Sequence, residues 1–249
     1  MISNVLAGIG EYTLFVGRSC SAITAVFRRR QEFIIQFRRI GFDSLLLITL
    51  TAAFTGLVTA LQAVYQSKGY IPQNLLSVLI SKSTMVELAP VLTALVLTGK
   101  VGAAMAAEIG TMKVSEQIDA LHSMNISAHQ FLYMPRILAG LIAFPLITIY
   151  ANTIGILCAW YFSYLRYSLH SHTFFNSMRS YFEPFDLWSG LIKSIVFGFF
   201  ITSLACFHGD RTYGGAEGVG RSTTRTVVQS SVAILIMDFI VAWVLFGNL

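Results

Sequence analysis

The chain has 249 residues, of which 55% are apolar and 12% are charged. Soluble domains carry about 25% charged residues, so this composition argues against a soluble fold. The formal net charge is +5, a sign that would suit nucleic acid. The basic residues, however, follow the ends of apolar segments and do not form one binding face, and we expect no nucleic-acid partner.

Residues 1–30 predict an amphipathic helix that lies flat at the membrane surface. Apolar residues recur there at spacings of three, four and seven, and the segment ends in three consecutive arginines at 28–30. An apolar face with cations near lipid headgroups is typical of an interfacial helix. A poorly ordered tail is the alternative. The apolar positions are Val5, Ile9, Tyr12, Val16, Ile23 and Phe27.

Five long apolar segments follow. A bilayer core about 30 Å thick needs about 20 apolar residues in a helix, and segments near 44–66, 86–107, 136–165, 187–208 and 226–249 meet that length. We therefore predict an all-α integral membrane protein with a single domain over residues 1–249. Residues 1–42 would form the interfacial helix and its lead-in, and residues 43–249 the five-span core. A two-fold axis would require a second copy of the chain, because no internal repeat is apparent.

The distribution of basic residues predicts the orientation. Most of the 17 Lys and Arg lie on one side of the membrane if the N-terminus is cytoplasmic, as the positive-inside rule requires. The prediction is N-terminus inside and C-terminus outside. Residues 167–184 then form an outer loop, and residues 209–225 form an inner loop that we expect to be a flexible connector because it is rich in glycine.

The sequence predicts neither a nucleotide site nor a metal site in this chain. The inner loop lacks the GxxxxGK[ST] pattern of phosphate-binding loops, so ATP would have to be bound by a separate chain, and no cofactor is expected here. His170 and His172 stand in the outer loop without nearby carboxylates or cysteines, so no metal ion is expected.

Charged residues lie within the predicted spans, among them Glu87, Lys193 and Asp238. Ionised side chains are costly in hydrocarbon and usually face a cavity or a partner. Glu87 has an alternative role as a helix cap, since Pro90 would suit the first turn of a helix that begins there. Lys193 and Asp238 either neutralise each other in a dry interior or face a wet cavity together with Glu87. Glu108 lies about 31 Å further along a helix than Glu87, at the opposite face of the membrane.

Residues 111–124 predict a short amphipathic helix on the cytoplasmic side. Ser115 would cap this helix, and Glu116 and Asp119 would occupy its first turns. Ile118, Leu121 and Met124 would form an apolar strip at a spacing of three. Such a helix either lies among the headgroups or docks into a groove of a partner, and its spacing does not choose between them.

Several long motifs resemble one family. Residues 87–121 read ELAPVLTALVLTGKVGAAMAAEIGTMKVSEQIDAL, residues 191–197 read LIKSIVF and residues 220–228 read GRSTTRTVV. Together with the end around 238–247, they resemble the MlaE/YrbE-type permeases, which are the membrane subunits of MCE-associated ABC lipid transporters. The resemblance covers nearly the whole chain and is weakest before residue 42.

The resemblance implies a homodimeric permease with two cytoplasmic ATPase subunits beneath it, MCE-domain proteins on the outer side and a phospholipid in an outward-facing cavity at the dimer interface. It also implies three groups of site residues. These are a substrate-binding group of Thr59, Tyr70, Val86, Glu87 and Leu88, the functional charges Glu87, Lys193 and Asp238, and an ATPase-coupling group of Lys113, Ser115, Glu116, Ile118, Asp119 and Leu121.

The chain departs from the family pattern at one point. Well-known members have an arginine directly before an ELGP-type motif, whereas this chain has Val86 there and Ala89 in place of the glycine. Headgroup recognition through that arginine therefore cannot be transferred. Lys82, Lys68 or Lys193 would have to supply a cation, or recognition would rest mostly on acyl chains.

The sequence thus predicts the permease subunit of an ATP-driven phospholipid transporter, with no bond chemistry of its own. The expected location is a bacterial inner membrane or a plastid inner envelope. One alternative is an integral membrane enzyme that modifies lipids, because intramembrane acids and a lysine could transfer protons. Two others are an ABC permease for another small hydrophobic substrate and a structural scaffold.

Overall fold

The computed structural model describes residues 2–21, 30–67, 72–167 and 169–247. Within these ranges every regular element is a helix, so the predicted all-α class is confirmed. The elements are α1 (Ile2–Cys20), α3 (Arg30–Gly41), η1 (Phe42–Ser44), α4 (Leu45–Ser67), α5 (Gln73–Ser83), η2 (Thr84–Leu88), α6 (Ala89–Leu97), η3 (Thr98–Gly102), α7 (Ala103–Val114), α8 (Gln117–Ser123), η4 (His129–Tyr133), α9 (Met134–Tyr167), α10 (Ser171–Ser180), α11 (Pro184–Asp210) and α12 (Gly215–Phe246).

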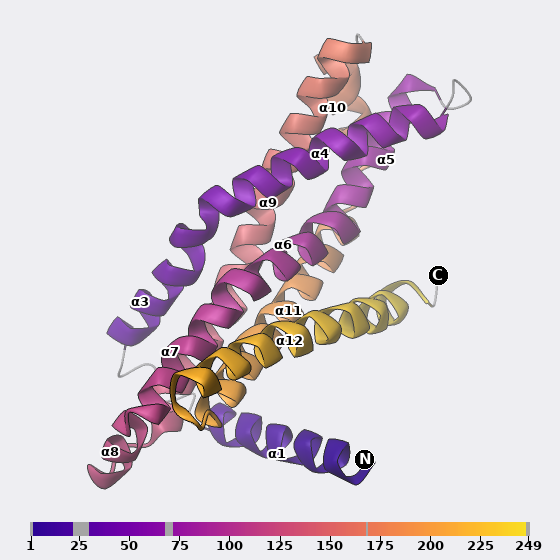
Figure 1. The fold of residues 1–249 in the computed structure, drawn as a ribbon. Coiled ribbons are helices and arrows are strands. Elements are labelled where there is room, and N and C mark those ends of the chain that lie inside the picture. Colours follow the sequence, from indigo (N-terminus) through magenta and orange to yellow (C-terminus); the bar gives the residue numbers. More distant parts are fainter. Residues whose placement is uncertain (1, 22–29, 68–71, 168, 248–249) are drawn as a thin grey trace.

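Five helical segments of the described chain are long and apolar enough to cross a membrane, which confirms the predicted number. They are 30–66, 75–114, 129–167, 184–210 and 215–246, and successive segments run in alternating directions (Figure 1). The helix α8 and the start of α12 therefore lie at one end of the bundle, and α10 lies at the other (Figure 1). We call these the α8 end and the α10 end. The predicted orientation, which remains a prediction, assigns the α8 end to the cytoplasm.

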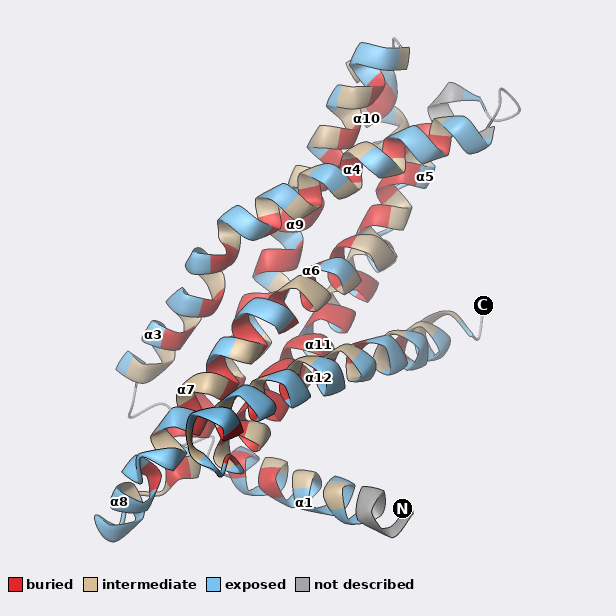
Figure 2. Cartoon of the chain, viewed as in Figure 1, coloured by how far each residue is buried: buried red, intermediate tan, exposed pale blue. Residues whose placement is uncertain are grey.

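The helix α11 occupies the centre of the bundle. In the most apolar stretch of α11, 67% of the residues are buried, against 11% in α12. Figure 2 shows the same contrast, with buried residues along α11 and a largely exposed α12. α11 packs against α7, α9 and α12. A charged side chain on α11 is therefore enclosed by its neighbours, whereas one on α12 lies near the surface.

Close contacts between small residues bring α4 against α9. A Cβ atom added at Gly56 would lie 2.0 Å from the carbonyl oxygen of Gly155, so the two backbones touch where neither residue has a side chain. The hydrophobic effect does not drive helices together inside hydrocarbon. Membrane helices therefore associate through close packing, which small residues permit. Gly140 of α9 makes a similar approach to Thr202 of α11. These contacts fix the spacing of the three helices.

The second span is longer than predicted and has a different start. One helical run continues from Gln73 to Val114, and Glu87 lies in its interior. The alternative role of Glu87 as the cap of a helix that begins there is therefore wrong. Pro90 has no N–H to donate to the carbonyl of Val86, and the widened π-helical turn η2 directly precedes it. A proline inside a membrane helix is tolerated when the local turn adjusts in this way.

Two predicted loops contain helices. The outer segment 167–184 includes α10, which packs against α5. The inner segment 209–225 holds a short turn, after which α12 begins at Gly215. Gly214 and Gly215 both adopt positive φ values, 86° and 68°, which only glycine reaches at little cost. The glycines therefore form a tight turn into α12, and the prediction of a flexible connector was wrong.

The predicted N-terminal helix is present as α1, and it packs against its own chain. Phe15 is buried. The centroid of its ring lies 5.1 Å from the ring centroid of Tyr133 and 5.7 Å from that of Phe207. The hydroxyls of Tyr12 and Ser203 share a hydrogen bond of 2.6 Å. Burial raises the pKa of Tyr12 to about 12, so this hydroxyl keeps its proton at neutral pH.

The other face of α1 is open. Ile9 is 56% exposed and Leu14 is 63% exposed, as expected for residues that meet lipid. The predicted apolar positions Ile23 and Phe27 lie outside the described residues. The burial of Phe15 was not predicted, because the apolar period alone does not reveal which face meets the bundle.

Candidate functional site: three charged side chains inside the spans

The three charged residues singled out from the sequence meet at one point. The Nζ atom of Lys193 donates a hydrogen bond of 2.5 Å to Oε2 of Glu87 and lies 2.9 Å from Oδ1 of Asp238. Lys193 comes from α11, Glu87 from η2 and Asp238 from α12. We call this group the triad. It links three spans through one ammonium group.

The local backbone explains how α11 and η2 approach closely enough for this contact. Gly190 lies one turn before Lys193, and a Cβ atom there would be 2.2 Å from the carbonyl oxygen of Met85. Glycine at this position therefore lets α11 touch the backbone of η2. The π-helical turn of η2 contains Glu87, and such turns occur often at functional sites.

The triad is not electrically neutral. It combines one ammonium with two carboxylates, and its formal charge is −1 when all three are ionised. The Lys193 side chain is fully buried, but the side chains of Glu87 and Asp238 are 44% and 24% exposed. An uncompensated carboxylate is costly against hydrocarbon. The exposed carboxylate edges therefore require water, a polar ligand or another chain.

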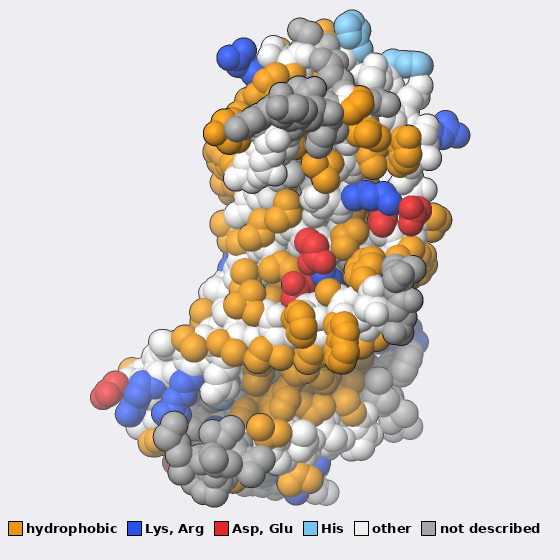
Figure 3. Space-filling model, turned by 90° about the vertical axis from the view of Figure 1, so that its right-hand side faces the viewer, with side chains coloured by type: hydrophobic (Ala, Val, Ile, Leu, Met, Phe, Trp, Pro, Cys, Tyr) orange, Lys and Arg blue, Asp and Glu red, His pale blue; other side chains and the backbone are white. Residues whose placement is uncertain are grey.

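The surface around the triad is apolar. Figure 3 shows acidic and basic side chains grouped partway along this face, bordered by hydrophobic ones. Large apolar side chains are exposed on the neighbouring part of α12, namely Leu235, Ile236, Phe239, Trp243 and Val244. The face thus combines a polar centre with an extended apolar surround.

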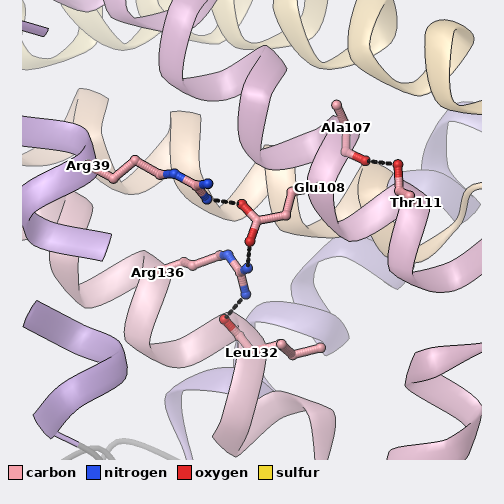
Figure 4. A network of polar contacts seen from close by, with 6 residues as sticks. All are labelled: Arg39, Ala107, Glu108, Thr111, Leu132 and Arg136. Atoms are coloured by element: carbon pink, nitrogen blue, oxygen red, sulfur yellow. Dashed lines mark hydrogen bonds and ion pairs between the residues drawn. The ribbon is translucent and has the colours of Figure 1, made fainter. Parts of the chain in front are cut away.

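A second polar cluster lies towards the α8 end. Glu108 of α7 accepts a hydrogen bond of 2.8 Å from Nη2 of Arg136 and pairs with Arg39 of α3 (Figure 4). Arg136 is buried and also donates to the carbonyl oxygen of Leu132, at 3.0 Å. Glu87 and Glu108 lie in the same continuous helical run, towards opposite ends of the second span, as predicted. Its contacts tie α3, α7 and α9 together, which indicates a structural role.

Four of the five predicted substrate-contact residues lie in the part of the chain that the structure describes. Leu88 lines a cavity of about 10 Å³ between α4, α6 and α9, about the volume that one water molecule needs. Thr59 is half-buried on α4, where its hydroxyl donates to the carbonyl oxygen of Thr55. Val86 and Leu88 are half-buried on either side of Glu87. Tyr70 lies outside the described residues.

The predicted coupling residues gather at the junction of α7 and α8. The ammonium of Lys113 lies 2.8 Å from a carboxylate oxygen of Asp119, and this hydrogen bond holds the pKa of Asp119 below its usual value. The prediction that Ser115 caps α8 was wrong: its hydroxyl donates back to the carbonyl oxygen of Thr111. Glu116 takes the capping position instead, with a positive φ of 60°.

The apolar strip of α8 is divided between two environments. Ile118 is buried against the bundle and Leu121 is half-buried beside it, whereas Met124 is 68% exposed. Ile118 therefore anchors α8 to its own chain. The exposed surface of α8 is formed by polar residues such as Glu116 and Asp119.

One further cluster was not predicted. Lys82 of α5 lies 3.1 Å from Glu183 and 3.2 Å from Asp186 at the start of α11. Lys82 and Lys193 were both considered as cations for a lipid phosphate, and each already pairs with two carboxylates. Lys68 lies outside the described residues. The sequence did not predict the contacts of Lys82 with Glu183 and Asp186, because they join segments about a hundred residues apart.

These features define an α-helical integral membrane protein with five spans and a charged triad between them. The family model for the permease MlaE matches residues 33–244. The chain belongs to the MlaE permease family.

Curated relatives agree with this membership. The chain is 36% identical to a probable ABC transporter permease protein of Rickettsia bellii over 96% of this chain and 92% of that protein. It is 34% identical to the intermembrane phospholipid transport system permease protein MlaE of Haemophilus influenzae, over 85% and 82% of the two chains. It is also 36% identical to the chloroplastic protein TRIGALACTOSYLDIACYLGLYCEROL 1 of Arabidopsis thaliana, over 83% of this chain and 59% of that protein.

Proposed function

We propose that the chain is the membrane permease subunit of an ATP-driven phospholipid transporter. The relatives named as ABC transporter permeases and as a phospholipid transport permease support this proposal. The observation that carries it is the half-exposed Glu87 of a triad with charge −1 inside the spans. In the proposed mechanism, the polar triad and its apolar surround face a shared cavity that holds a lipid.

The proposed cavity forms between two copies of the chain. Exposed apolar residues on α12 and the exposed carboxylate edge of the triad lie on one face. The apolar residues suit either lipid or a packed partner, whereas the exposed carboxylate is costly against lipid and favours water. A second copy placed over this face would leave the triads of both copies around a common space.

The proposed lipid is held mainly through its acyl chains. Lys193 is enclosed behind its two carboxylates, and Lys82 pairs with Glu183 and Asp186. Neither ammonium is free to bind a phosphate without a rearrangement. The net negative charge of the triad would also repel a phosphate, which favours placing the headgroup away from it.

ATP binding and hydrolysis are assigned to separate cytoplasmic subunits, and an MCE-domain protein to the outer side. The short helix α8 would enter the ATPase, and closure of the dimer would move lipid between the cavity and the MCE-domain protein. The membrane would be a bacterial inner membrane or a plastid inner envelope, and the chloroplastic relative supports the second setting.

The transport proposal predicts a loss of flux when the triad carboxylate is neutralised. In liposomes that contain the complete transporter, Glu87→Gln should reduce ATP-dependent transfer of a fluorescent phospholipid by about tenfold or more, because a hydrogen bond to a charged group contributes about 1.5–3 kcal/mol. Glu183→Gln, which removes a carboxylate exposed at the α10 end, is the matched control.

Unchanged flux in a correctly assembled Glu87→Gln transporter would contradict the proposal. The same assay separates the alternatives. Recovery of a chemically altered lipid without ATP would identify a lipid-modifying enzyme. Native mass spectrometry that finds a different small molecule in the cavity would identify another kind of permease.

The coupling proposal predicts that Glu116→Lys weakens ATPase binding. Glu116 is exposed at the tip of the α7–α8 junction, so the charge reversal alters a contact surface and leaves the bundle intact. Co-purification of the ATPase should fall several-fold while the permease dimer remains. Glu217→Lys, at an exposed position of α12 at the same end, should retain the ATPase. Equal ATPase recovery from both variants would reject the role of α8.

A further inference from the structure

A cavity at the α8 end has no part in the proposed transport route. Its volume is about 560 Å³, and it lies between α1, α11 and α12. Ligand pockets in proteins commonly measure about 300–1,000 Å³. Figure 3 shows a recess lined by hydrophobic side chains below the protruding C-terminal helix, on the side where α1 lies. The cavity is therefore open to the surroundings of the bundle.

One part of the cavity wall is apolar. Ile9 of α1 contributes a largely exposed side chain, and Leu204 and Phe207 of α11 contribute buried ones. The contact between Tyr12 and Ser203 holds α1 against α11 beside this wall. These residues provide a surface suited to an acyl chain, since burial of apolar surface is favourable and needs no specific geometry.

The other part of the wall is basic. Arg211 lies over the ring of Phe207, with 4.3 Å between its guanidinium carbon and the ring centroid, and it pairs with Glu11. Arg225 is exposed and makes no ion pair or hydrogen bond within the described chain. His208 shares a hydrogen bond of 2.7 Å with Gln229 across α11 and α12. Aspartate and glutamate are absent from the residues that line the cavity.

The apolar and basic walls meet at the end of the bundle that the charge distribution assigns to the cytoplasm. An arginine without a carboxylate partner is suited to a phosphate, which its planar guanidinium can bind through two hydrogen bonds. An acyl chain placed along Ile9 and Leu204 would have its phosphate near Arg225. The combination matches a membrane lipid with a net negative charge.

We infer that this cavity binds one anionic phospholipid, whose phosphate contacts Arg225 and whose acyl chain lies between α1 and α11. This lipid belongs to a single chain and remains bound to it. The inference therefore goes beyond the proposed function, in which a transported lipid occupies a cavity between two copies.

The test uses photo-crosslinking of lipids to the purified full-length chain in nanodiscs. The nanodiscs contain phosphatidylcholine and a minor amount of phosphatidylglycerol that carries a diazirine on one acyl chain, and labelled peptides are identified by mass spectrometry. We expect labelling of the peptides that contain Ile9 and Leu204. Arg225→Gln should reduce this labelling about fivefold, as expected for the loss of one cation at an anionic lipid surface.

Arg221→Gln is the matched control. Arg221 lies one turn earlier on α12, is exposed and pairs with Glu217, and it does not line the cavity. Its loss changes the charge of the same helix end by the same amount, so labelling should remain at the wild-type level. Equal losses in the two variants would overturn the inference, because they would show general attraction to the surface.

Three further outcomes would also overturn the inference. Equal labelling by diazirine phosphatidylcholine would remove the requirement for negative charge. Loss of labelling in inorganic phosphate at constant ionic strength would indicate a free phosphate site. A disulfide between two copies of an Ile9→Cys variant would show that a second copy fills the cavity. The assay needs neither ATP nor partner subunits, so its failure would leave the transport proposal standing.

Discussion

Lys193→Met is expected to lower the free energy of unfolding by about 3–5 kcal/mol, the usual effect of removing one partner from a buried ion pair. The substitution keeps most of the apolar stem of the side chain but leaves Glu87 and Asp238 without their cation. The charge of the site then changes from −1 to −2. Unfolding of the purified chain by sodium dodecyl sulfate in mixed micelles measures the effect.

Two further variants test this explanation. Lys100 is exposed and donates to the backbone carbonyl of Asp43. Because water can replace this partner, Lys100→Met should cost no more than about 1.5 kcal/mol, the lower end of the range for a hydrogen bond to a charged group. The double variant Glu87→Gln with Lys193→Met removes one of the two uncompensated charges, and it should be more stable than Lys193→Met alone. Additive losses in the double variant would show that the triad does not act as a unit.

Gly56→Ala is expected to destabilise the chain by about 3 kcal/mol, at the upper end of the usual range for overpacking. The added Cβ atom would lie 2.0 Å from the carbonyl oxygen of Gly155. The obstacle is backbone and not the end of a flexible side chain, so α4 and α9 must move apart. The same unfolding assay measures this loss.

Gly99→Ala provides a control with the opposite sign. A Cβ atom at Gly99 meets nothing within 4 Å, and alanine is favoured over glycine in helices by about 0.5–1 kcal/mol. The variant should therefore be slightly more stable than the wild type. Destabilisation by both substitutions would mean that glycine is needed for backbone freedom, and not for the contact between α4 and α9.

The sequence by itself determined the five spans and the candidate charges. Length and apolarity are enough for the spans, because a segment in hydrocarbon must satisfy its backbone hydrogen bonds internally, and a helix does so. Glu87, Lys193 and Asp238 were recognisable from the sequence for a related reason, since a charge within such a segment needs a special environment.

The tertiary structure alone decided which residues meet. The sequence left open whether Lys193 pairs with Asp238 alone or meets Glu87 as well, because the spacing along one helix does not specify its neighbours. The contact of Lys193 with both carboxylates, and that of Arg136 with Glu108, became visible only once the helices were packed. The same reason applies to α8 and to the turn before α12. Their local patterns predicted a serine cap and a flexible loop, whereas Ile118 packs against the bundle and two glycines with positive φ form a tight turn into α12.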